Sequence, residues 1–160
     1  MSKPLAVTRA KFDPPPKKAA NDMTVSDGQS ISLGGEEVHF AVTPAHTPGT
    51  LSLWFKVTDN GAPHTAGMYG GIGMPRTDEL KQLQLKSMAH WMDVTKAAKV
   101  DAQIGNHPLH FNGPARFELL KYRQPGQKNS FVIGSPAYQR FMGMMDECVK
   151  MSLARDGITQ

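Results

Sequence analysis

Two histidines, His46 and His107, each follow a predicted strand and lie in a loop that is rich in proline and glycine. His46 lies in TPAHTPGT (43–50), where a proline on either side fixes φ and the following glycine permits a tight return. His107 lies in GNHP (105–108). Such a loop holds an imidazole rigidly at the rim of a sheet. A rigid position suits a zinc ligand, because the imidazole nitrogen has to lie about 2.0–2.1 Å from the metal ion. The alternative to a ligand role is that each is an ordinary surface histidine. Because the two lie far apart in the sequence, only the tertiary fold could bring them into one site.

The elements that would position these histidines follow from hydrophobic periodicity and turn residues. The pattern predicts strands over 31–33, 38–43, 51–57, 64–69 and 100–105, and helices over 77–98, 113–122 and 135–155. A turn at Asp59-Asn60-Gly61 joins two of the strands as a hairpin. This order of strands, helix, strand and helices predicts an α+β fold with a mixed sheet covered by helices.

Alternation and helical spacing predict which residues face the core. In strand 38–43, Val38, Phe40 and Val42 form the expected core face, and His39 and Ala41 the other. Strand 51–57 is almost wholly apolar and is expected to be buried on both faces. The expected apolar stripes are Leu80, Leu83, Ser87, Trp91, Val94 and Ala98 in one helix, and Tyr138, Phe141, Met145, Cys148 and Ser152 in the last. Trp54 and Trp91 are expected to anchor the contact between sheet and helix, and His64 is expected to be structural.

Length and charge narrow the classes of function. The 160 residues favour one domain with a real core, and the single cysteine, Cys148, excludes an intrachain disulfide. The net charge is +4, and five of the 18 basic residues lie in a Pro-rich segment, so residues 1–22 read as a basic arm or linker before a domain at 23–160. A basic tail of this kind is typically solvated, so we expect no nucleic-acid partner. No apolar run is long enough for a membrane span, and no signal peptide is visible.

The histidine loops and their surroundings resemble the metallo-β-lactamase superfamily. TPAHTPGTLSL is similar to the second histidine motif of that family, usually PGHTPGS/T. The hairpin DNGAPH, the pair Gly70-Gly71, the segment NHP and the last helix follow in the same order as in metallo-hydrolases close to the third β-lactamase subclass. The resemblance implies that His46 and His107 are zinc ligands. It also implies that the loop with Gly70 and Gly71 borders the site.

Departures from the family pattern are equally informative. The family's main metal motif, H-x-H-x-D-H, is absent from this sequence, and Ala45 stands where a glycine usually precedes the histidine. The resemblance therefore implies the C-terminal half of an αββα sandwich. His110, three residues after His107, is a candidate substitute ligand or outer-shell residue. No catalytic residue is identified in this half.

For the complete family site, the resemblance implies one or two zinc ions whose bound hydroxide attacks a β-lactam or a related amide or ester carbonyl of a small molecule. A catalytic zinc needs three protein ligands, so this chain is expected to be inactive alone. A homodimer or a complementary N-terminal half would be its protein partner. The alternative is a non-catalytic half-fold that binds or assembles with another chain. Family relatives are often exported to the periplasm, but the sequence leaves the compartment open.

Overall fold

The computed structural model describes residues 19–20 and 22–157, so most of the predicted arm lies outside the described residues. The elements follow the predicted order closely. The strands are β1 (Ser30–Leu33), β2 (Glu36–Val42), β3 (Leu51–Asp59), β4 (Ala62–Tyr69) and β5 (Ala102–Gly105). The helices are α2 (Asp78–Ala97), a 3₁₀ turn η1 (Pro108–Phe111), α3 (Gly113–Lys121) and α4 (Ser135–Arg155). None of these helices is both long and apolar enough to cross a membrane.

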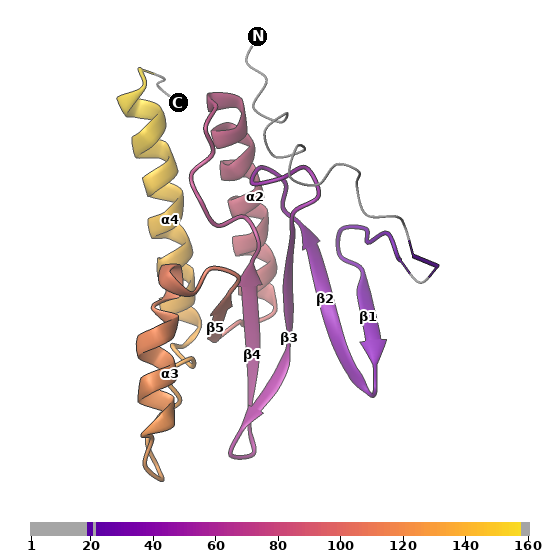
Figure 1. Ribbon diagram of the computed structural model, residues 1–160, viewed down its shortest axis with the longest axis vertical. Coiled ribbons are helices and arrows are strands. Elements are labelled where there is room, and N and C mark those ends of the chain that lie inside the picture. The colour runs from indigo at the N-terminus through magenta and orange to yellow at the C-terminus, as the bar shows by residue number, and fades with distance from the viewer. Residues whose placement is uncertain (1–18, 21, 158–160) are drawn as a thin grey trace.

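The strands form one mixed sheet in the order β1-β2-β3-β4-β5 (Figure 1). Strands β1 to β4 pair antiparallel, whereas β5 pairs parallel to β4. The β3–β4 hairpin turns at Asn60 and Gly61, which both have positive φ (49° and 82°), as a two-residue turn of this kind requires. It follows that β2, β4 and β5 run in the same direction and end at the same edge of the sheet.

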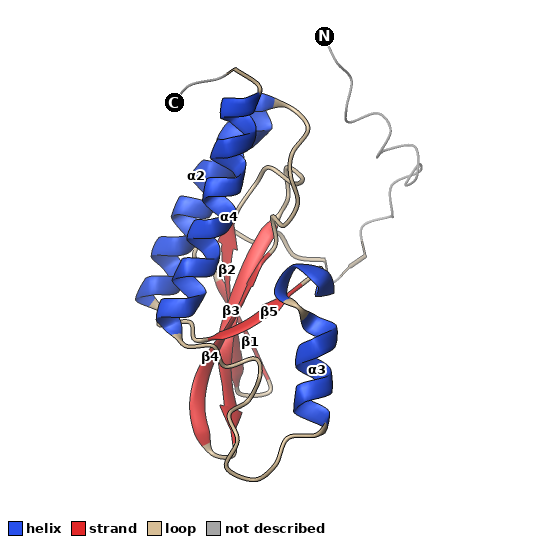
Figure 2. Ribbon diagram, turned by 90° about the vertical axis from the view of Figure 1, so that its left-hand side faces the viewer, coloured by secondary structure: helices blue, strands red, loops and turns tan. Residues whose placement is uncertain are grey.

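Helices α2 and α4 pack together on one face of the sheet, and α3 lies on the opposite side (Figure 2). Trp91 of α2 and Tyr138 of α4 are both fully buried there, and Trp91 Nε1 donates a hydrogen bond of 3.1 Å to the Tyr138 hydroxyl. Burial raises the pKa of Tyr138, so its hydroxyl remains protonated. Trp54 packs against this core from β3, as predicted. The α+β expectation of a mixed sheet covered by helices is therefore confirmed.

The prediction of which sheet face is covered by the helices was wrong. Ala41, not its alternate neighbours, is buried in the core under α2 and α4. Val38, Phe40 and Val42 of β2 point the other way and are only half-buried. Across from them, Leu51, Leu53 and Phe55 of β3 are half-buried too, so β3 is not buried on both faces. These six apolar residues are called the front face below.

The predicted helix stripes also need correction. The buried residues of α2 are Lys81, Gln84, Ser87, Met88, Trp91 and Thr95, and those of α4 are Tyr138, Met142, Val149 and Leu153. Each helix contacts both the sheet and the other helix, so the buried surface is broader than one stripe and is rotated from it. Cys148 is only partly buried. Gly134 takes the N-cap position of α4, and Ser135 is the first helical residue.

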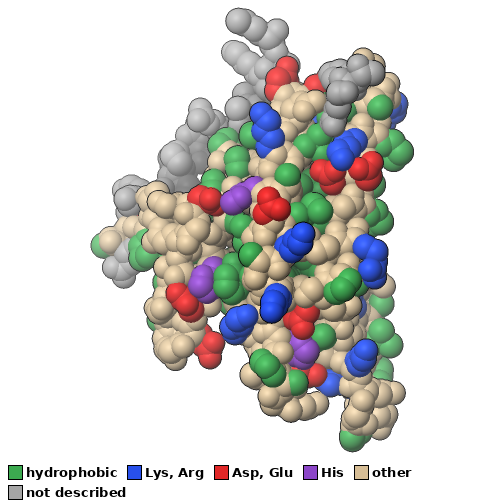
Figure 3. Space-filling model, turned by 180° about the vertical axis from the view of Figure 1, so that it is seen from behind, with side chains coloured by type: hydrophobic (Ala, Val, Ile, Leu, Met, Phe, Trp, Pro, Cys, Tyr) green, Lys and Arg blue, Asp and Glu red, His purple; other side chains and the backbone are tan. Residues whose placement is uncertain are grey.

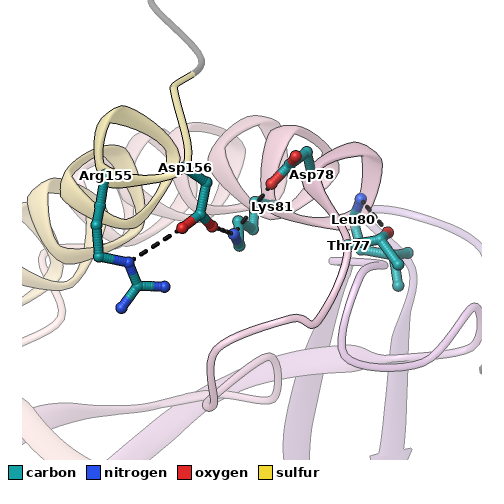
Figure 4. Close-up of polar contacts among 6 residues, drawn as sticks. All are labelled: Thr77, Asp78, Leu80, Lys81, Arg155 and Asp156. Carbon is teal, nitrogen blue, oxygen red and sulfur yellow. Dashed lines mark hydrogen bonds and ion pairs between the residues drawn. The ribbon is translucent and has the colours of Figure 1, made fainter.

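A buried lysine joins the start of α2 to the end of α4 (Figure 4). Lys81 is 4% exposed, and its ammonium contacts Asp78 Oδ1 at 3.0 Å and also the carboxylate of Asp156. A buried charge requires such partners, because desolvation otherwise penalises it. The hydrogen bond from Lys81, assisted by Arg155, lowers the pKa of Asp156. Both helix ends are thus tied by one charge cluster, next to the Thr77 side chain that caps α2.

Close packing of α4 on the sheet predicts opposite effects for two glycine substitutions. A Cβ on Gly67 would lie 2.7 Å from Val100 Cγ1 and 3.0 Å from the Tyr138 hydroxyl, whereas one on Gly143 of α4 would meet nothing within 4 Å. We expect Gly67→Ala to lower the free energy of unfolding by about 1–3 kcal/mol. Gly143→Ala should raise it by about 0.5–1 kcal/mol. Urea denaturation of both variants tests this, and equal effects would contradict the packing described.

The lowered pKa of Asp156 predicts a pH-dependent stability. Its contribution is present above the ordinary carboxyl value of 3.8 and is lost as the pH falls through the lower pKa of the folded state. Asp156→Asn should therefore melt below wild type at neutral pH, and the difference should shrink below pH 3.8. Asp93→Asn, at an exposed residue of α2 without an ion pair among the described residues, is the control. A melting difference that is constant with pH would argue against this ion pair.

Candidate functional site: two histidine loops at one edge of the sheet

The structure brings His46 and His107 together. His46 lies in the loop between β2 and β3, and His107 directly follows the short connection after β5. Because β2 and β5 end at the same edge of the sheet, the two loops are neighbours despite their distance in sequence. The imidazole centroids are 6.2 Å apart, and the rings are inclined by 76°. Both side chains are exposed, so their nitrogen atoms are accessible from solvent.

The loop around His46 is held by a compact set of hydrogen bonds. Thr43 N donates to Thr50 O (3.0 Å) where the loop closes, and Thr47 N donates to Thr50 Oγ1 (2.9 Å). Ser87 of α2 donates from Oγ to Pro44 O at 2.5 Å. Ala45 is 4% exposed and has φ of 144°, a backbone region that favours glycine. The residue before His46 therefore holds a strained conformation that the surrounding contacts must maintain.

The loop around His107 is fixed by the turn that follows it. His107 is the N-cap of η1, and its carbonyl accepts a hydrogen bond from His110 N at 3.1 Å. Phe111 at the end of η1 is 6% exposed and packs so closely on Gly105 that a Cβ there would lie 2.7 Å from its ring. This turn also brings the ring of His110 to 5.6 Å from that of His107. The structure thus groups three histidines from two sequence-distant loops, with His107 next to both His46 and His110.

A loop of glycines lies between the two histidine loops. It comprises Gly70, Gly71, Ile72 and Gly73 after β4 and is called the glycine loop below. A Cβ on Gly70 would lie 2.0 Å from Leu51 O, so no other residue fits there without a backbone shift. Gly73 approaches His46 so closely that a Cβ on it would lie 3.4 Å from Nδ1. The residues predicted to border the site, Gly70 and Gly71, are buried beneath it rather than exposed at its surface.

The donor atoms fit zinc in type but not in number. Neutral imidazole is a common zinc ligand, and His46 and His107 present two such rings, with His110 as a third beside them. Yet residues 19–20 and 22–157 contain no group of three or more His, Cys, Asp or Glu side chains arranged to hold a metal ion. A catalytic zinc site requires three protein ligands and an open position. The described residues do not complete such a site.

Two other histidines, His64 and His39, form contacts that stabilise the fold away from the candidate site. His64 Nδ1 lies 2.7 Å from Asp101 Oδ2, and Asp101 Oδ1 accepts a hydrogen bond from Thr65 N at 2.8 Å. This pair joins the start of β4 to the chain entering β5, far from the edge that carries His46. His39 stacks on Trp54 with ring centroids 3.7 Å apart. Neither histidine belongs to the candidate site.

Comparison with known proteins finds a likeness only among solved structures, since no family model and no curated protein matches the chain. BJP-1, a subclass B3 metallo-β-lactamase of Bradyrhizobium japonicum, aligns with a TM-score of 0.65 and 22% identity. FEZ-1, the metallo-β-lactamase from Legionella gormanii, aligns with a TM-score of 0.66 and 23% identity. MEM-A1, a subclass B3 metallo-β-lactamase from a soil metagenome library, aligns with a TM-score of 0.64 and 21% identity.

These alignments cover most of this chain but only part of the others. They include 84%, 83% and 86% of this chain, but 51%, 51% and 53% of BJP-1, FEZ-1 and MEM-A1 respectively. The chain therefore spans about half the length of the structures that it matches. At these identities the likeness concerns the fold. The described residues have the fold of the C-terminal half of a subclass B3 metallo-β-lactamase.

Proposed function

We propose that this chain supplies His46 and His107 to the zinc site of a metallo-β-lactamase-like hydrolase. The observation that carries this proposal is the approach of two sequence-distant imidazoles to 6.2 Å at one edge of the sheet. A zinc ion bound there would act as a Lewis acid on a small molecule with a β-lactam or related amide or ester carbonyl. His46 and His107 would bind the metal through neutral imidazole and would not act as general bases. His110 is the candidate third ligand from this chain.

A complete site needs ligands from outside the described residues. The two or three imidazoles among the described residues fall short of a closed ligand set, and the alignment covers only 51% of BJP-1. We therefore propose that a complementary polypeptide segment, equivalent to the other half of the fold, brings the remaining ligands to the same edge. Without it, the chain is expected to hold zinc weakly and to have no hydrolase activity.

The front face is the proposed docking surface for that segment. Its side chains Val38, Phe40, Val42, Leu51, Leu53 and Phe55 are apolar and incompletely buried. By contrast, the opposite side of the molecule carries charged side chains of both signs scattered over its surface (Figure 3), as expected for a surface in contact with water. A continuous apolar area on a sheet commonly marks an interface. The same face also supports the second candidate function, a non-catalytic half-fold that assembles with another chain.

Removal of either histidine should weaken zinc binding by the isolated chain. We expect His46→Ala and His107→Ala each to lower the apparent zinc affinity by more than the roughly tenfold effect of losing an outer-shell contact. His64→Ala is the matched control, because its ring already pairs with Asp101 away from this edge. Competition with a chromophoric chelator measures the affinity. Zinc uptake that is absent in wild type, or that survives both substitutions, would contradict the assignment of these ligands.

An open front face predicts a monomer that binds an apolar dye. We expect the chain to sediment as a monomer and to increase the fluorescence of anilinonaphthalene sulfonate. Phe40→Lys and Leu53→Lys, at positions paired across β2 and β3, should remove this signal. Leu33→Lys is the control, because Leu33 is 84% exposed at the end of β1. A dimer that Phe40→Lys dissociates would show instead that a second copy of this chain covers the face.

A further inference from the structure

The glycine loop contacts both histidine loops through separate residues. On one side, Gly73 lies next to the His46 ring, because a Cβ added to it would be at van der Waals distance, 3.4 Å from Nδ1 and 3.5 Å from Cε1. On the other side, Asn106 Nδ2 donates a hydrogen bond to Gly70 O at 3.1 Å. Asn106 directly precedes His107, so its side chain ties the second histidine loop to the same segment. The glycine loop therefore lies beside both histidine loops and links them.

The glycine loop is itself held from below by buried side chains. Gln84 of α2 is fully buried, and its Nε2 donates to both Gly71 O (2.9 Å) and Gly73 O (3.0 Å). The Ser52 hydroxyl of β3 accepts a hydrogen bond from Gly70 N at 3.0 Å and shares one with Thr43 at 2.7 Å. Between these contacts, Ile72 is 3% exposed and packs into the core. Each residue of the glycine loop is thus fixed by at least one buried contact or close approach.

The placement of Gln84 is not explained by packing alone. A fully buried amide costs free energy unless it is hydrogen-bonded, and an apolar side chain of the same length would fill this space but would leave two carbonyls of the glycine loop without this donor. Both bonds of Nε2 go to the glycine loop, whereas Oε1 has no partner within residues 19–20 and 22–157. The amide is therefore used only to fix two carbonyls of one loop. The second of these carbonyls belongs to Gly73, the residue of this loop that lies next to His46.

We propose that Gln84 and Asn106 are positioning residues that set the separation and inclination of His46 and His107. Gln84 acts on His46 through Gly73, and Asn106 acts on His107 through its bond to Gly70. This inference rests on the proposed function of the two histidines, because a defined separation matters for residues that share a site. Ligand geometry has to be held within about 0.5 Å for such a site to work.

The test uses the metal-free full chain, uniformly labelled with ¹⁵N, and two substitutions. Gln84→Met keeps the length and burial of the side chain but removes both hydrogen bonds. We expect it to shift the imidazole signals of His46 and to remove the nuclear Overhauser effects between His46 and Gly73. Asn106→Ala should shift the signals of His107 and the amide signal of Gly70. The signals of His64, which lies away from this edge, should stay at their wild-type values in both variants.

Two control variants separate positioning from a general loosening of the fold. Thr95→Val removes a buried hydroxyl from the same helix, about 16 Å along α2 from Gln84 by helix rise, and should leave His46 unchanged. Asn129→Ala removes an asparagine that bonds Asp59 instead of the glycine loop and should leave His107 unchanged. If Gln84→Met fails to fold, Asn106→Ala still tests the inference, because Asn106 is exposed.

Unchanged His46 and His107 spectra in both variants would overturn the inference, whether or not the chain binds zinc. Zinc titration of the same samples tests the proposed function separately. We expect roughly tenfold weaker binding in each variant, the size that loss of an outer-shell contact has in metal sites. Wild type without zinc uptake, combined with shifted His46 signals in Gln84→Met, would contradict the proposed function and support the positioning roles. Normal zinc uptake by wild type, combined with unchanged His46 and His107 spectra in both variants, would support the proposed function and contradict the positioning roles.

Discussion

The shared direction of β2, β4 and β5 is the constraint on which the candidate site depends. These strands end at one edge because β2, β3 and β4 alternate in direction and β5 joins β4 in parallel. The loops that follow them carry His46, the glycine loop and His107 in that spatial order. Had β5 paired antiparallel to β4, its end would lie at the opposite edge, and the two imidazoles would be separated by the length of the strands.

The two faces of the sheet differ in how completely their side chains are buried or paired. On the side of α2 and α4, several buried polar groups are paired, as Trp91 is with Tyr138 and Lys81 with two aspartates. On the front face, apolar side chains remain half-exposed, and at the adjoining edge the part of the chain that the structure describes supplies too few ligands beside the imidazoles for a metal site. Under the proposed function, a single segment that packs on the front face and ends near His46 would both bury these apolar side chains and supply the remaining metal ligands.

Much of the fold could be predicted from local patterns, whereas the orientation of its elements could not. Alternation identified which residues of β2 share a face, but it contains no information on which face the helices cover, so Ala41 was placed on the wrong side. The buried stripes of α2 and α4 were displaced for a related reason, since each helix packs against two neighbours. Gln84 and Asn106 carried no signal in sequence, because glutamine and asparagine are usually exposed and their partners are backbone carbonyls of a distant loop.

The sequence by itself determined the order of strands and helices, the turns between them and the histidine loops as candidates for metal chemistry. Those features depend on neighbouring residues, such as the prolines that flank His46 and the Asn60-Gly61 turn. Only the tertiary structure decided that the ring centroids of His46 and His107 lie 6.2 Å apart, that the glycine loop lies beside both histidine loops and that the front face stays half-exposed. The reason is that strand direction, sheet order and helix docking are set by long-range packing, which local spacing along the chain does not encode.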